Sequence, residues 1–243
     1  MRKSTIVTAL LSALPILGSG AAVAGDSPFT SNVALTTDYA YRGISQTDER
    51  PALQGGFDFA HDSGLYVGVW GSNVSWLNDV ETTSSSGNSL ELDIYAGYKM
   101  PLGPVTLDVG LLQYYYPGDY DRTWKSETGL KTPDTLEGYV GLSWEFLTFK
   151  YSHAFTNLFG TPDSEASKYY DLTAAYEVMP GLTLNAHFGR QDIKGPADSY
   201  NDWKLGLTKA VGDFNVGLHY VDTDINDVDI AEERVILSVS RTF

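Results

Sequence analysis

Residues 90–100 of the chain read LELDIYAGYKM, in which apolar and polar positions alternate. Successive side chains of a β-strand point to opposite faces, whereas a helix would mix the two sets. The stretch therefore predicts a strand with one apolar face and one polar face. The apolar face would carry Leu90, Leu92, Ile94, Ala96, Tyr98 and Met100, and the other face Glu91, Asp93, Tyr95, Gly97 and Lys99.

The same period of two recurs along nearly all of the chain. It predicts about twelve strands of roughly ten residues, the length that a tilted strand needs to cross a bilayer. The first strand is expected over residues 33–42, with Tyr39 and Tyr41 on its apolar face, and the third over residues 65–76. The last strand ends at the C-terminal Phe243, and a terminal aromatic is a sign of bacterial outer-membrane barrels. The last strand is expected to begin near Arg234. The remaining strands are expected to begin near Leu53, Leu90, Val105, Leu136, Phe149, Tyr170, Leu182, Trp203 and Phe214.

Short and long connections between the expected strands alternate. Short periplasmic turns and longer external loops are the asymmetry of outer-membrane barrels, and both termini then lie on the periplasmic side. Because backbone groups that face hydrocarbon must be bonded within the protein, we expect a single antiparallel transmembrane β-barrel. The short connections are residues 61–64, 101–104, 145–148, 179–181 and 210–213, and the long ones are residues 78–89, 117–134, 157–167, 193–199 and 223–232.

The N-terminus has the parts of a secretory signal peptide. Arg2 and Lys3 precede an apolar run, and Ala22-Val23-Ala24 supplies the small residues needed for cleavage. We expect a cleaved signal peptide over residues 1–24 and one barrel domain over residues 25–243, in the outer membrane of a Gram-negative bacterium. An N-terminal membrane anchor is the weaker alternative, because the apolar run is shorter than the ~20 residues of a spanning helix.

Composition limits the classes of function. The formal net charge is −15, and loss of Arg2 and Lys3 with the leader makes the mature chain still more acidic. Such a chain would repel a phosphate backbone, so nucleic acid is not an expected partner. The chain has no cysteine, so we expect neither disulfides nor redox chemistry, and no cofactor is indicated. The expected partners are outer-membrane lipid, small polar solutes or ions, and the barrel-assembly machinery, which would engage the strand ending at Phe243.

Several short motifs near the N-terminus carry a family resemblance. Residues 37–47 read TDYAYRGISQT, residues 51–56 read PALQGG, and GLY and WGS follow at residues 64–66 and 70–72. In these motifs the chain resembles the proteobacterial Gcw_chp family, whose members are labelled TorF-type porins. The resemblance implies an outer-membrane barrel and encourages a transport function, and it brings no catalytic residues with it.

If the apolar faces meet lipid, the alternate faces send charged side chains into the barrel. Acids outnumber bases among them, so one expectation is a water-filled pore that prefers cations. The alternative is that these charges pair with one another and fill a narrow interior. The pore-lining candidates are Asp38, Arg42, Asp58, Glu91, Asp93, Lys99, Asp108, Glu137, Glu145, Lys150, Asp171, Glu177, Lys204 and Arg234.

Two of these candidates, Asp38 and Arg42, lie four residues apart on one face of the first expected strand. From there they would reach Gln54 and Asp58 across the first hairpin. We interpret them as a clamp that sets the register of this hairpin, with a role in selectivity as the alternative.

An acidic segment near the C-terminus partly matches a calcium-binding loop. Asp222, Asp224, Asn226 and Glu233 supply oxygens at positions one, three, five and twelve of an EF-hand-like loop. Asp227 occupies position six, where the sharp turn needs glycine. A solvated hairpin tip is therefore the favoured interpretation, with weak binding of a divalent cation as the alternative.

The chain offers no convincing catalytic set. His153 adjoins Ser152, but neighbours on a strand point to opposite faces. His187 and Asn185 share a face without a serine beside them, and the chain has no serine-hydrolase elbow, zinc-binding His pair or phosphate-binding loop. We therefore do not expect an enzyme.

The favoured function is a small porin-like channel for polar solutes. The second hypothesis is a non-conducting structural or adhesive barrel that acts through residues 78–89 and 117–134. An outer-membrane hydrolase is the third.

Overall fold

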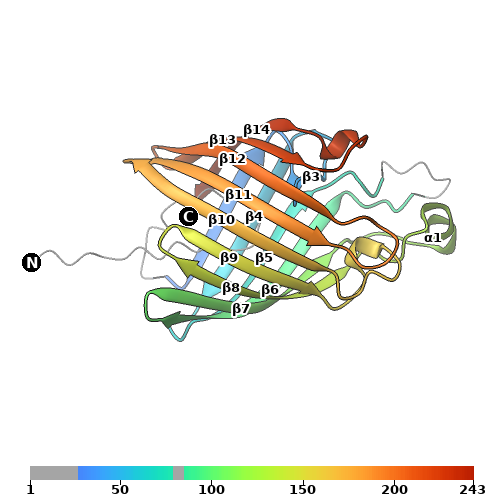
Figure 1. The fold of residues 1–243 in the computed structure, drawn as a ribbon, viewed down its shortest axis with the longest axis horizontal. Coiled ribbons are helices and arrows are strands. Elements are labelled where there is room, and N and C mark those ends of the chain that lie inside the picture. Colours follow the sequence, from blue (N-terminus) through green and yellow to red (C-terminus); the bar gives the residue numbers. More distant parts are fainter. Residues whose placement is uncertain (1–26, 79–84) are drawn as a thin grey trace, which may run out of the picture.

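The structure, a computed structural model, describes residues 27–78 and 85–243. The expected signal peptide, residues 1–24, lies outside the described residues, as do residues 79–84 of the expected 78–89 loop. Twelve strands of the described residues close into one barrel, in the order β1-β14-β13-β12-β11-β10-β9-β8-β7-β6-β5-β4 (Figure 1). The predicted fold class and strand number are confirmed.

Every neighbouring pair of barrel strands is antiparallel, and the pairing of β1 with β14 closes the sheet. Two further short strands, β2 (Ala40–Tyr41) and β3 (Ile44–Ser45), form a separate two-stranded sheet. The barrel strands are β1 (Phe29–Thr36), β4 (Ala52–Ala60), β5 (Leu65–Asn73), β6 (Leu90–Leu102), β7 (Val105–Tyr115), β8 (Thr135–Trp144), β9 (Leu147–Ala154), β10 (Lys168–Met179), β11 (Leu182–Asp192), β12 (Tyr200–Val211), β13 (Phe214–Thr223) and β14 (Arg234–Thr242).

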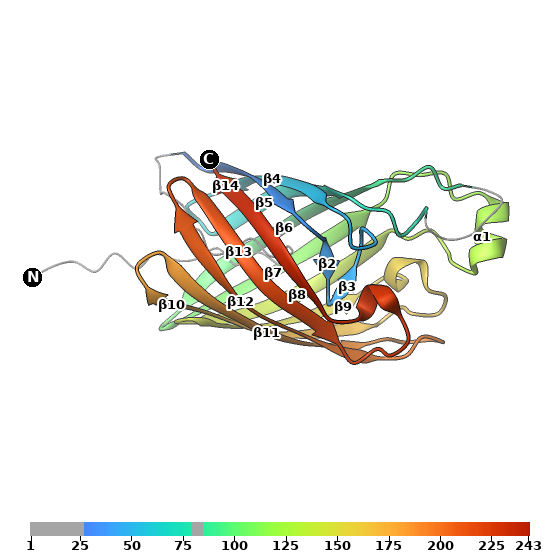
Figure 2. The ribbon, with the colours of Figure 1, turned by 90° about the horizontal axis from the view of Figure 1, so that it is seen from above.

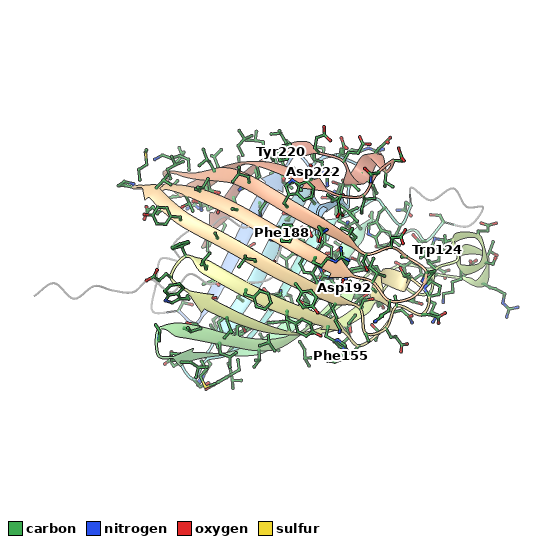
Figure 3. The ribbon with its side chains drawn as sticks, viewed as in Figure 1. Trp124, Phe155, Phe188, Asp192, Tyr220 and Asp222 are labelled. Atoms are coloured by element: carbon green, nitrogen blue, oxygen red, sulfur yellow. The ribbon has the colours of Figure 1, made fainter. Side chains whose placement is uncertain are left out.

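The two faces of each barrel strand have different surroundings. In β6, Leu92 and Ile94 are 37% and 52% exposed on the outer surface, whereas Glu91 and Asp93 are each 1% exposed inside the barrel. Large apolar side chains cover the outside of the other strands in the same way, as the sticks show (Figure 3). An exposed apolar belt around a closed sheet fits hydrocarbon rather than water.

The connections differ in length between the two ends of the barrel. Tight turns join β4 to β5, β6 to β7, β8 to β9, β10 to β11 and β12 to β13, at the end where β14 finishes. The long connections gather at the opposite end, beside α1 (Arg122–Thr128), as Figures 1 and 2 show. These ends are called the turn end and the loop end below.

The long connections contain the helices of the described residues. Asp121 is the N-cap of α1, and its Oδ1 accepts a hydrogen bond from the Trp124 backbone N–H at 2.7 Å. Two short 3₁₀ turns, η1 (Leu158–Gly160) and η2 (Asp229–Ala231), lie in later connections at the same end. No helix in the described part of the chain has the length and apolarity that a membrane crossing requires.

Two of the predicted strands are longer than the strands that form. β1 ends at Thr36 rather than at Arg42, and β5 ends at Asn73 rather than at Trp76. In the first case the chain bends at Thr37 and leaves the wall, because Asp38 is bound by Arg234 and Ser45, and it then reverses at Arg42 and Gly43, whose φ angles are 46° and 83°. Two successive positive φ angles make a type I′ hairpin turn, which an extended strand cannot contain.

Candidate functional site

The connection between β1 and β4 folds into the barrel over residues 38–47, and residues 48–51 are exposed. Figure 2 shows β2 and β3 beside β14, in the half of the barrel nearer the loop end. We call residues 38–47, which contain these two strands, the inner hairpin. Its tip meets the wall directly, because a Cβ added to Gly43 would clash with the side chains of Thr223 and Asp202.

A buried ion pair fixes the inner hairpin to β14. Arg234 Nε donates to Asp38 Oδ2 at 2.6 Å, and the two side chains are 7% and 5% exposed. Arg234 Nη2 also donates to the carbonyl oxygen of Gly43 at 2.6 Å. The other carboxylate oxygen of Asp38 accepts from Ser45 Oγ at 2.5 Å and from Thr47 Oγ1 at 3.0 Å. Asp38 therefore ties both arms of the hairpin to the wall.

Two tyrosines of the inner hairpin reach the far side of the lumen and join an aromatic cluster there. The ring centroid of Tyr39 lies 5.5 Å from that of Trp70, and Tyr41 lies 5.6 Å from Tyr114. The sequence interpretation of Tyr39 as lipid-facing is wrong, since this side chain is 1% exposed inside the barrel. The buried members of the cluster are Tyr39, Ala52, Trp70, Val74, Leu77, Tyr95, Leu112, Tyr114, Tyr116, Trp124 and Tyr139.

Carboxylates within this cluster are bonded to tyrosine hydroxyls. Glu91 accepts from Tyr39 Oη and from Tyr116 Oη, each at 2.6 Å. Asp58 accepts from Tyr95 Oη at 2.5 Å. Such hydrogen bonds lower the cost of placing polar groups away from water. The β4–β8 side of the lumen is thus packed as a core.

Arg42 connects the tip of the inner hairpin to the other side. Its Nη2 donates to Glu137 Oε2 of β8 at 2.7 Å, and its Nη1 donates to Gln191 Oε1 of β11 at 2.6 Å. The guanidinium also lies over the ring of Tyr169 of β10, 4.2 Å from the centroid. The side chains of Arg42 and Glu137 are 6% and 3% exposed. Together with the tyrosines, Arg42 fills the cross-section of the barrel at this level.

The β9–β12 side of the lumen is polar and partly open to solvent on the turn-end side of Arg42. The side chains of Asp171 and His187 are 26% and 12% exposed. His187 Nε2 lies 2.8 Å from Asp202 Oδ1, and His187 Nδ1 lies 3.5 Å from Asp171 Oδ1. Lys150 and Lys204 are half-buried, and neither forms an ion pair within the described residues. We call Lys150, Asp171, His187 and Lys204 the polar strip.

The structure places most of the predicted pore-lining residues inside the barrel. Glu145 is an exception, because it lies exposed in the turn between β8 and β9 with a φ of 52°. Glu177 is also exposed, and its Oε1 accepts from the Gly181 backbone N–H at 2.8 Å in the next turn. The residues on the inward faces of strands are Asp58, Glu91, Asp93, Lys99, Asp108, Glu137, Lys150, Asp171, Lys204 and Arg234. Their role as the lining of a pore stays a prediction.

The predicted clamp of the first hairpin is wrong. Asp38 and Arg42 lie on the inner hairpin instead of on β1, and among the described residues their ion pairs are with neither Gln54 nor Asp58. Their partners come from sequence-distant strands, namely Arg234 for Asp38 and Glu137 for Arg42.

Sequence reasoning missed Tyr169, Gln191 and Asp202, and it weighed His187 only as a catalytic candidate. A signal was present for two of them, because Tyr169 continues the inward row of Asp171 on β10, and Asp202 that of Lys204 on β12. Each of the two residues lies directly before an expected strand start, Tyr169 before Tyr170 and Asp202 before Trp203.

The four candidates for a divalent-cation loop do not converge. Asp224 binds Asn201 of β12 through both carboxylate oxygens, at 2.7 and 2.5 Å. Asp222 points outward beside Tyr220, whose hydroxyl donates to it at 3.0 Å (Figure 3). In the described ranges no three His, Cys, Asp or Glu side chains, including Glu233, form a group that could hold a metal ion. Asn226 Nδ2 lies 3.4 Å from the carbonyl oxygen of Asp224, so these residues form a hydrogen-bonded loop.

Comparison with known proteins agrees with this architecture. The KdgM porin structure is similar with a TM-score of 0.56 and 6% identity, over 88% of this chain and 98% of that one. The NanC porin gives 0.53 and 11% over the same shares, and an outer membrane channel from Pseudomonas putida F1 gives 0.52 and 15% over 89% and 96%. At these identities the likeness concerns the fold alone. No curated protein matches the chain.

A family model described as "Bacterial protein of unknown function (Gcw_chp)" matches residues 21–243. This match covers the described barrel, the inner hairpin and the polar strip. The chain belongs to the Gcw_chp family.

Proposed function

We propose that the protein is an outer-membrane channel for small polar solutes, that it prefers cations, and that it is not an enzyme. The observation that carries the proposal is the polar strip, a line of partly exposed charged side chains inside a barrel whose outer surface is apolar. A polar strip that is partly open to solvent is what a solute path along the wall requires. The likeness of the fold to porins supports the proposal.

Charge supports the preference for cations. Residues 222–233 at the loop end carry six acids and no base, so a cation approaching from that end meets a negative potential. Counted over all inward side chains, acids also outnumber bases, while the polar strip itself holds two lysines and one carboxylate. In the described residues the inward carboxylates are Asp38, Asp58, Glu91, Asp93, Asp108, Glu137, Asp171 and Asp202, and the inward Lys and Arg residues are Arg42, Lys99, Lys150, Lys204 and Arg234.

The carboxylates differ in their access to water. Glu91 and Asp93 are each 1% exposed among aromatic rings, whereas the Asp171 side chain is 26% exposed. A permeating ion would therefore interact with Asp171 far more than with Glu91.

The test is planar-bilayer recording of the purified protein, with reversal potentials measured in a salt gradient. We expect discrete current steps and a K⁺ permeability above that of Cl⁻. Asp171→Asn is expected to lower the permeability ratio about twofold, while Glu91→Gln changes it little, because one charge near the path is lost only in the first variant. Absence of current steps would contradict the channel. If Asp171→Asn leaves the permeability ratio unchanged, the proposed role of this charge in the cation preference is wrong.

A second candidate function is a non-conducting structural or adhesive barrel. The inner hairpin favours it, because Tyr39, Tyr41 and Arg42 fill one cross-section of the lumen. The bilayer recording separates the two candidates, since a non-conducting barrel gives no current steps even when the inner hairpin is removed.

Localisation and assembly follow from the same proposal. We expect export by a signal peptide over residues 1–24 and insertion into the outer membrane of a Gram-negative bacterium. The C-terminal Phe243, which follows β14, has a side chain that is 63% exposed at the turn end. We infer that the barrel-assembly machinery engages this strand.

A further inference from the structure

Arg42 occupies a special position at the tip of the inner hairpin. It is the first of the two central residues of the type I′ turn, with a φ of 46°. A non-glycine residue pays a conformational penalty there, since the left-handed region is unfavourable for most side chains. The turn projects the Arg42 side chain across the lumen toward β8, β10 and β11, where its guanidinium binds.

Arg42 lies directly above the polar strip, on its loop-end side. Tyr169, which stacks under the guanidinium, is the inward residue next to Asp171 on β10. Gln191, which accepts from Arg42 Nη1, lies two inward positions beyond His187 on β11. The partly hydrated side of the lumen therefore ends at the Arg42 guanidinium.

The other lumen-spanning residues of the inner hairpin do not face this hydrated side. Tyr39 and Tyr41 pack into the aromatic cluster of β5–β8. Asp38 faces β14, where its carboxylate is held by Arg234. Arg42 is thus the side chain of the inner hairpin that separates the polar strip from the loop end.

We propose that Arg42, paired with Glu137, forms the constriction of the channel and sets its ion selectivity. This inference rests on the proposed channel function. A solute that follows the polar strip must pass between the inner hairpin and the β8–β11 wall, so the Arg42–Glu137 pair lies on its path. The paired state presents no net charge to the solute, and loss of either partner leaves the other charge uncompensated.

The two partners therefore have opposite predicted effects. Removal of the guanidinium leaves the Glu137 carboxylate to attract cations, and removal of the carboxylate charge leaves the guanidinium to attract anions. A unit charge about 4 Å from an ion changes its population roughly fivefold even at the permittivity of water. If the two substitutions only loosened the hairpin, the K⁺/Cl⁻ permeability ratio would change in the same direction in both variants.

The experiment measures single-channel conductance and the K⁺/Cl⁻ permeability ratio of the full-length mature protein in planar bilayers. Arg42→Ser is expected to raise the conductance and to raise the permeability ratio about fivefold. Glu137→Gln is expected to lower the ratio by a similar factor, and Arg42→Lys to restore the wild-type ratio. The control is Arg50→Ser, because Arg50 is exposed in the same connection and pairs with Asp48 at the surface. That variant is expected to match the wild type.

Several outcomes overturn the inference. Equal ratios in the wild type, Arg42→Ser and Glu137→Gln, with normal conductance, would refute it while leaving the channel intact. A change of the permeability ratio in the same direction in both variants would also refute the inference. Retention of the folded, heat-modifiable band on gels shows that each variant forms the barrel, and replacement of residues 40–45 by a Gly-Ser link provides a second way to remove the constriction. If the wild type and this replacement both pass no current, the proposed channel function itself fails.

Discussion

Replacement of Asp38 by alanine tests the anchor of the inner hairpin. The Asp38 carboxylate accepts three hydrogen bonds, from Arg234 Nε, Ser45 Oγ and Thr47 Oγ1. Its ion pair with Arg234 is buried, with side chains 5% and 7% exposed. Removal of one partner of a buried pair leaves the other charge uncompensated and costs about 3–5 kcal/mol. We therefore expect Asp38→Ala to destabilise the docked hairpin by about 4 kcal/mol.

The same connection offers a matched control. Asp48 and Arg50 form an ion pair at 2.6 Å, as short as the buried one, but their side chains are 45% and 66% exposed. Exposed pairs contribute about 0–1 kcal/mol, because solvent screens the charges and the side chains lose entropy. Asp48→Ala should therefore leave the hairpin docked. Because the two ion pairs have the same length, the difference between the two variants measures the effect of burial.

Two assays measure the effect of Asp38→Ala. Urea unfolding of the folded barrel in detergent micelles reports the free energy of unfolding of the whole protein. Trypsin reports local release, because an undocked hairpin exposes Arg42 to cleavage while the barrel stays closed. Asp38→Ala should either lower the free energy of unfolding by several kcal/mol or make Arg42 cleavable. Wild-type behaviour in both assays, or equal effects of Asp38→Ala and Asp48→Ala, would refute the reasoning.

Two further predictions concern the wall of the barrel. In single-cysteine variants of this cysteine-free chain, a charged thiol reagent should label Thr173→Cys in the lumen faster than Leu172→Cys, which faces lipid. Equal rates would contradict the assignment of the two faces. Phe243→Ala should slow insertion by the barrel-assembly machinery and leave spontaneous folding in detergent nearly unchanged, because this side chain is 63% exposed and the substitution keeps the backbone hydrogen bonds of residue 243 with Ser31. Equal slowing of both processes would show that Phe243 stabilises the barrel itself and is not a recognition element.

The barrel could be predicted from sequence because its cause is local. Each strand separates lipid from lumen through a period of two, and residues 90–100 show that period directly. The tight turns carry their own chemical signal, as in Pro101-Leu102-Gly103-Pro104. Neither feature depends on contacts between distant parts of the chain.

The inner hairpin could not be predicted in the same way. Residues 33–42 alternate like a strand, and tyrosine suits both a membrane interface and a hydrogen-bonded interior. The location of Tyr39 depends on Glu91, 52 residues away, and that of Asp38 on Arg234, 196 residues away. Alternation within one segment carries no information about such partners. The one local sign was Arg42-Gly43, a pair whose glycine favours a type I′ turn.

The size of the barrel gives a reason for an inner hairpin. Side chains of the wall just fill a barrel of about eight strands, whereas about sixteen leave a wide aqueous channel. A barrel of twelve strands lies between these cases. Here inward glycines make room for large rings, since a Cβ on Gly97 or Gly110 would clash with the hydroxyl of Tyr66 or Tyr139.

The remaining space at the loop end is filled by the inner hairpin, and the space along β9–β12 stays polar and partly exposed. Under the proposed channel function, the wall would provide the passage and residues 38–47 its closure. Substitutions on the inner hairpin should consequently change conduction more than substitutions of the same size on the strands. For the same reason, selectivity should depend on Arg42 at the hairpin tip and on its partner Glu137 of β8.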